Sequence, residues 1–188
     1  MKFQKYMAVG ILGLTMALGF SGCQSENQKN QDAYRKIGIN SMAEGDYDKA
    51  VKSFQKALDT SLGKIGAEEI DICYYKAAAQ FAKKDYDGAI ETYTSLIDYD
   101  KENANAYYLR GSVYLDTDKK DKAFKDYKNA VKYAGREYEI YEGIYENLTN
   151  KGETEEAKNY LKKALDIKPK DGADYAEQGH VYYLLEDY

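Results

Sequence analysis

Proline, tryptophan and histidine are almost missing from this sequence of 188 residues. Proline and histidine each occur once, at Pro169 and His180, and tryptophan is absent. A sandwich or barrel of short strands needs many turn residues, so the near absence of proline argues against these folds and against a proline-rich linker. With a single histidine, neither a histidine-based catalytic triad nor a histidine cluster is expected.

Cysteine is also scarce, with only Cys23 and Cys73 in the chain. If Cys23 is consumed by a modification, Cys73 has no disulfide partner, and one cysteine with one histidine does not make a zinc site. No glycine-rich phosphate loop occurs, and no pair of carboxylates stands in a recognisable acid–base pattern. We therefore predict that the protein is not an enzyme and holds no cofactor or metal.

The residues that are abundant indicate a folded helical protein. Charged residues make up 31% of the chain, hydrophobic residues make up 44%, and there are 21 tyrosines. This hydrophobic content argues against a disordered acidic tail. The net charge of -5 lacks the basic surface that nucleic acids require, so no nucleic acid partner is expected.

The N-terminal residues have the three-part layout of a secretory signal. Lys2 and Lys5 precede an uncharged, mostly apolar stretch at residues 7–20, which is shorter than the ~20 residues of a membrane-spanning helix. The stretch ends in Ser21, Gly22 and Cys23, which resembles the lipobox of bacterial lipoproteins, although Phe20 stands where that family usually has leucine.

The lipoprotein resemblance implies that residues 1–22 are removed and that Cys23 receives a lipid. The protein would then be anchored to a membrane of the cell envelope, outside the cytoplasm. Residues 23–31 would form the lipidated cysteine and a polar tether. The alternative is a plain signal peptide in which the cysteine is incidental.

The remainder of the chain repeats itself. Four similar stretches share one alanine at spacings of 39, 34 and 34 residues, namely Ala50, Ala89, Ala123 and Ala157. Tyrosines that precede them are also 34 residues apart, at Tyr107, Tyr141 and Tyr175. A fixed period of this length indicates an array of small structural repeats.

This pattern resembles the tetratricopeptide repeat, a helix-turn-helix unit of 34 residues. The resemblance implies an all-α, right-handed superhelical solenoid of about four full repeats and one extra helix. The predicted repeats cover residues 31–64, 70–103, 104–137 and 138–171, with a partial repeat at 172–188. The two helices of a repeat cross closely, so eight residues into a repeat a small residue is expected, as at Gly38, Gly111 and Gly179.

The resemblance also implies that the first helix of each repeat, helix A, lines a concave groove. The groove residues would be Tyr74, Phe81, Tyr108, Ser112, Glu142 and Glu146, with His180 in the fifth segment. Such a surface suits a protein or an extended peptide with apolar and basic residues. The alternative is a solvated helix face whose glutamates merely fall at helical spacing.

Two functions follow from these features. The first is a lipid-anchored, non-catalytic module that binds protein partners through the groove outside the cytoplasmic membrane. The second is a structural accessory of envelope assembly or surface polysaccharide handling that braces other envelope proteins.

The apolar residues of 181–185 have no following helix to cover them, which favours a truncated array or a docked partner.

Overall fold

The computed structural model describes residues 25–185, and every regular element in that range is a helix. This confirms the prediction of an all-α fold built from repeated helices. The predicted signal peptide and the lipidation site at Cys23 lie outside the described residues.

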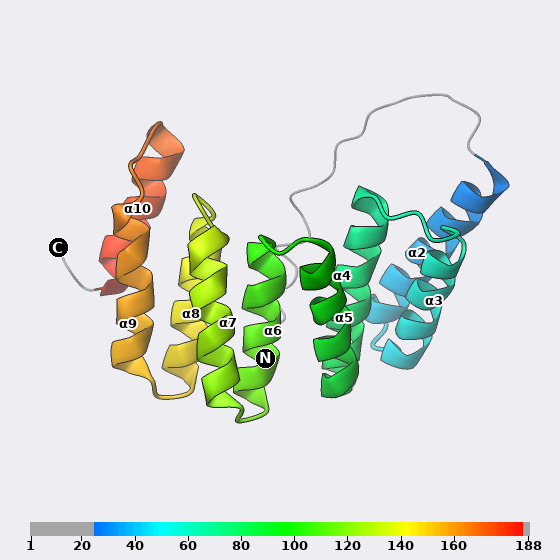
Figure 1. Cartoon of the computed structure of the whole chain (residues 1–188), viewed down its shortest axis with the longest axis horizontal. Helices are drawn as coiled ribbons and strands as arrows, with labels where there is room; N and C mark the ends of the chain where they lie inside the picture. The colour runs from blue at the N-terminus through cyan, green and yellow to red at the C-terminus, as the bar shows by residue number, and fades with distance from the viewer. Residues whose placement is uncertain (1–24, 186–188) are drawn as a thin grey trace. The chain divides into compact units, whose positions relative to one another are not determined.

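The described residues form two compact units that divide between Tyr99 and Asp100. Each unit contains two pairs of helices that run side by side, and the C-terminal unit ends in one further helix (Figure 1). The N-terminal unit contains α2 (Glu26–Ala43), α3 (Tyr47–Asp59), α4 (Ala67–Ala82) and α5 (Tyr86–Tyr99). The C-terminal unit contains α6 (Ala104–Asp116), α7 (Lys120–Tyr133), α8 (Tyr138–Asn150), α9 (Thr154–Lys162), the 3₁₀ helix η2 (Lys163–Asp166) and α10 (Gly172–Leu185).

The helices follow the period of the sequence. Helices α6, α8 and α10 begin at residues 104, 138 and 172, where the predicted repeats begin. Each of the four helix pairs turns through one residue with a positive φ: Gly45, Lys84, Asp118 and Gly152. In this backbone conformation the amide after the turn residue reaches back to a carbonyl of the finished helix, as in the 2.8 Å bond from Asp46 N to Ser41 O.

The start of the fold differs from the predicted tether. Helix α2 begins at Glu26, and the Ser25 hydroxyl caps it by accepting a 3.2 Å hydrogen bond from the Gln28 amide. Gln31 is buried and donates a 2.7 Å hydrogen bond to Glu69 on α4. The prediction of a tether through residue 31 is therefore wrong from Glu26 onward. This polar segment is helical because Ser25 caps its first turn and Gln31 forms a hydrogen bond with the neighbouring helix α4.

Glycine allows close contact within two of the helix pairs. A Cβ atom at Gly38 would lie 2.5 Å from the ring of Phe54, and one at Gly111 would lie 2.8 Å from the ring of Tyr127. Both rings are fully buried. Gly179 occupies the same repeat position in α10, but nothing lies within 4 Å of a Cβ placed there.

Tyrosine fills much of the core of the C-terminal unit. The Tyr127 ring lies between those of Tyr108 and Tyr160, with centroid distances of 6.4 and 6.1 Å. The buried Tyr127 hydroxyl forms two hydrogen bonds: it donates to Ser112 Oγ at 3.4 Å and accepts from Asn147 Nδ2 at 3.3 Å. Burial raises the pKa of Tyr127, so the phenol stays neutral and acts as a packing residue.

Candidate functional site

Helix α4 carries the predicted aromatic part of the groove. Tyr74 and Phe81 are both half-buried. The Tyr74 ring lies 6.3 Å from that of Tyr93, and the Phe81 ring meets Tyr86 edge-on at 5.6 Å. Each ring is therefore held by a neighbouring aromatic while part of it remains accessible, which suits contact with an apolar group of a partner.

Charged residues connect α2 to α4 in the N-terminal unit. Arg35 forms an ion pair with Asp71, in which its Nε donates to the Asp71 carboxylate at 2.9 Å. The Arg35 guanidinium also lies 5.3 Å from the centre of the Tyr75 ring. The charges of Arg35 and Asp71 therefore neutralise each other between α2 and α4.

Two predicted groove residues on α6 instead belong to the core. Tyr108 is only 8% exposed, and Ser112 is 2% exposed. The Tyr108 hydroxyl lies 2.3 Å from where a Cβ of Gly143 would be, so the missing side chain in α8 provides the space for this ring. Ser112 donates to the Tyr108 carbonyl at 2.9 Å and accepts from Asn147 at 2.8 Å. The groove assignment of Tyr108 and Ser112 is therefore wrong.

The acidic part of the predicted groove lies on α8, and Glu142 in it faces α10. Glu142 and Glu146 are half-buried, and Glu142 Oε1 lies 2.7 Å from His180 Nδ1. Burial raises the pKa of Glu142, while the hydrogen bond to His180 opposes this rise. Glu177 on α10 completes a cluster in which one ligand atom from each of Glu142, Glu177 and His180 lies within 4.8 Å of the others.

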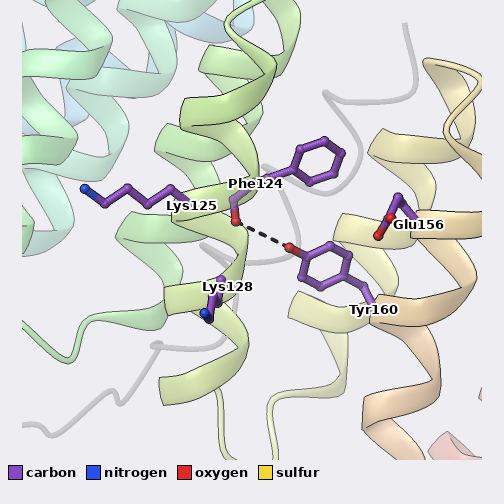
Figure 2. Close-up of a pocket in the computed structure, with 5 residues that line it drawn as sticks. All are labelled: Phe124, Lys125, Lys128, Glu156 and Tyr160. Carbon is purple, nitrogen blue, oxygen red and sulfur yellow. Dashed lines mark hydrogen bonds between the residues drawn. The ribbon is translucent and has the colours of Figure 1, made fainter.

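A surface that the sequence analysis did not consider lies between α7 and α9 (Figure 2). An open cavity of about 430 Å³ is lined by Phe124, Lys125, Lys128, Glu156 and Tyr160. The Tyr160 hydroxyl donates to the Phe124 carbonyl at 3.3 Å and holds the two helices together there. The apolar rings beside lysines make this a second candidate contact surface. It is formed by α7 and α9, which are the second helices of their pairs.

No helix among residues 25–185 combines the length and the apolar character that are needed to cross a membrane.

Comparison with protein families decides the class of the chain. A TPR repeat model matches residues 77–118, and two tetratricopeptide repeat models match residues 35–93 and residues 104–136 with 146–171. The chain belongs to the tetratricopeptide repeat family. Tetratricopeptide repeat proteins are in general non-catalytic scaffolds, so this chain carries a protein–protein interaction module.

Solved structures of several other proteins are similar to this chain. A crystal structure of MamA is 26% identical, with a TM-score of 0.57, over 73% of this chain and 78% of MamA. TTC0263, a thermophilic TPR protein of Thermus thermophilus, is 17% identical over 84% of both chains with the same TM-score of 0.57. The Pseudomonas aeruginosa protein pilF is 17% identical over 87% of this chain and 72% of its own, again at 0.57.

At 17% identity, the similarities to TTC0263 and pilF show only that the fold is shared. A comparison with curated protein sequences found no match.

Proposed function

We propose that this tetratricopeptide repeat protein is a lipid-anchored, non-catalytic module that binds a protein partner outside the cytoplasmic membrane. The anchor is supported by the sequence of the N-terminus, where an apolar stretch leads into Ser21, Gly22 and Cys23. A diacylglycerol on the Cys23 thiol, with acylation of the new N-terminus, would hold the chain at the membrane, since each buried methylene contributes ~0.8 kcal/mol.

The half-buried aromatic pair on α4 is the observation that carries the binding proposal. Tyr74 and Phe81 are seven residues apart, so they lie on the same face of the helix, two turns from each other. Aromatic residues that are rigidly held but accessible are frequent anchors of protein interfaces. The partner segment would therefore place an apolar or aromatic side chain against this face of α4.

In the C-terminal unit, Glu142 and Glu146 lie one turn apart on α8 and supply negative charge. Complementary charge favours a partner with a lysine or arginine. A partner segment that contacts this face of α8 would therefore carry a basic residue. Tyr108 and Ser112 have no part in this proposal because they are buried.

The binding proposal is tested by comparing variants of α4. Cross-linking in intact cells and mass spectrometry would identify the partner, and its affinity for the purified full chain would then be measured by titration. Tyr74→Ala and Phe81→Ala should each weaken binding at least tenfold, which corresponds to about 1.4 kcal/mol. Tyr99→Ala is the control, because Tyr99 is 55% exposed at the end of α5 and makes no part of the α4 face. Unchanged affinity in both α4 variants would refute the assignment.

The lipid anchor is tested by metabolic labelling with a fatty acid that carries an alkyne group. The label should be present in the wild type and in Cys73→Ala but absent in Cys23→Ala. Cys73 is a suitable control because it is a partly buried thiol whose pKa is raised by burial, so its thiol is poorly reactive. Labelling that persists undiminished in Cys23→Ala would show that the lipid is attached at another residue.

The cavity between α7 and α9 favours a second candidate function. A structural accessory of envelope assembly or surface polysaccharide handling would need contact surfaces beyond the helix A faces, and Phe124 and Tyr160 would provide one (Figure 2). For such a brace, cross-linking should give one stoichiometric partner whose capture depends on Phe124 and not on Tyr74. A partner that is lost in Tyr74→Ala alone would contradict the brace.

A further inference from the structure

Helices α8 and α10 bring an imidazole and two carboxylates together. Glu177 and His180 are three residues apart on α10, so their side chains share one face of that helix, and Glu142 faces them from α8. The ligand atoms of the three residues lie within 4.8 Å of one another. Glu142 and His180 are 38 residues apart in the sequence, so only the folding of α10 against α8 creates the cluster.

In the part of the chain that the structure describes, this cluster contains more acidic groups than basic ones. Two carboxylates face one imidazole, whose Nδ1 lies 2.7 Å from Glu142 Oε1. Among residues 25–185, Glu177 forms no hydrogen bond or ion pair of its own, and Glu139 adds further negative charge near Glu142. The Glu142 side chain is 16% exposed and that of His180 is 49% exposed, so an ion can reach the cluster from solvent. A cation would relieve the repulsion between these carboxylates.

We propose that Glu142, Glu177 and His180 bind a divalent transition metal ion such as Zn²⁺. One imidazole nitrogen with two carboxylate oxygens is a donor set that suits zinc and its neighbours in the first transition row. The two carboxylates would also neutralise the charge of the ion. The sequence analysis predicted no metal site because it counted histidine and cysteine and left the carboxylates out.

The geometry requires only small side-chain movements. With metal–ligand bonds of about 2.1 Å, tetrahedral donor atoms lie about 3.4 Å apart. The present pair of His180 and Glu142 at 2.7 Å has to open slightly, and Glu177 has to move inward from a separation of at most 4.8 Å. Rotations of glutamate side chains cover such distances without backbone movement. Three protein ligands leave a fourth position open for water or for a ligand from another molecule.

Metal binding would also fasten α10 to α8. The described bonds that hold α10 in place include the Tyr145 hydroxyl donating to the Leu184 carbonyl at 3.1 Å and the Gln178 amide donating to the Ile167 carbonyl at 2.6 Å. A metal would add a cross-link between the first helix of the fourth repeat and the fifth segment. The amides of α10 would then exchange with deuterium more slowly when the metal is bound.

Titration of the purified full chain with ZnCl₂ tests the site. The chain is solubilised in detergent, carries no histidine tag and is first treated with a chelator. Isothermal titration calorimetry should show one equivalent of Zn²⁺, and Co²⁺ should give the visible absorption of a low-symmetry complex. His180→Ala and Glu142→Gln should each weaken Zn²⁺ binding at least tenfold. Circular dichroism spectra that match the wild type would establish that these variants are folded.

Two matched variants serve as controls. Glu146→Gln removes a carboxylate from the same face of α8 one turn away, and Cys73→Ala removes the one described thiol; both should leave Zn²⁺ binding unchanged. Slower hydrogen exchange in α10 on Zn²⁺ addition, absent in His180→Ala, would support the cross-link independently. The proposal is overturned if the wild type binds no Zn²⁺, if His180→Ala binds it equally well, or if Mg²⁺ and Ca²⁺ bind as tightly as Zn²⁺.

Discussion

Replacement of Gly111 with alanine should destabilise the C-terminal unit, whereas the same replacement at Gly179 should stabilise it. Both glycines lie in helix interiors at the same position of the repeat. A Cβ atom at Gly111 would lie 2.8 Å from two ring carbons of Tyr127 and 3.2 Å from the Asp126 Cβ. No atom lies within 4 Å of a Cβ at Gly179.

The magnitude follows from two opposing effects. Alanine in place of glycine in a helix interior contributes about 0.8–1.0 kcal/mol of stability. Forcing an extra carbon into a packed core costs about 1–3 kcal/mol. Tyr127 is fully buried between two other rings, so it cannot rotate away from the new methyl group. Both variants gain the same helix preference of alanine over glycine. Their free energies of unfolding should therefore differ by about 1–3 kcal/mol, and this difference measures the steric clash alone.

Urea unfolding followed by far-ultraviolet circular dichroism would measure both changes. We expect the unfolding midpoint of Gly111→Ala to fall below that of the wild type and that of Gly179→Ala to rise above it. Gly38→Ala, which places a Cβ atom 2.5 Å from the Phe54 ring, should behave like Gly111→Ala in the N-terminal unit. Equal stabilisation by alanine at Gly111 and Gly179 would refute the argument that close helix contact selects the small residue.

Three further predictions concern single residues. Burial, and then the nearby Asp32 carboxyl, raise the pKa of Glu68 from its ordinary value of 4.5 to about 7. The folded protein therefore favours the protonated carboxyl, and this contribution to stability is lost as the pH rises from about 4.5 through about 7. The free energy of unfolding from urea titrations at pH 5 and pH 8 should therefore fall more in the wild type than in Glu68→Gln, and equal pH dependence would contradict this. Arg110→Met should lower the free energy of unfolding by about 3–5 kcal/mol, because it leaves the buried Asp126 carboxylate without its hydrogen bonds of 2.7 and 2.8 Å to Arg110. The double variant Arg110→Met with Asp126→Asn should recover part of this loss in the same urea titration. Gln31→Ala should lower the free energy of unfolding by about 1.5–3 kcal/mol by removing a hydrogen bond to a carboxylate on α4, and an unchanged value would favour the tether that the sequence suggested.

The described helices agree with the sequence most closely where the repeat is most regular. The 34-residue spacing of Ala123 and Ala157 marks the second helix of each pair, and α7 and α9 contain these alanines at fully buried positions. The N-terminal end of the fold was harder to predict. Residues 26–31 are polar throughout, and their helical state depends on the Ser25 cap and on the bond between Gln31 and Glu69 of another helix.

The candidate site was less predictable than the fold. Tyr74 and Tyr108 occupy the same position in successive repeats, yet Tyr74 is half-buried and Tyr108 is in the core. The signal that separates them is Gly143, which lies on the next first helix and leaves room for the Tyr108 ring. A pattern within one repeat does not contain this information, because the space is provided by a different repeat.

The sequence by itself determined the helical class, the period and the need for a small residue at Gly38 and Gly111, since these follow from local periodicity and side-chain volume. Only the tertiary structure decided which groove residues are accessible and that His180 meets Glu142 and Glu177. These properties depend on side chains of separate helices. The distance between such side chains is set by packing and not by their spacing along the chain.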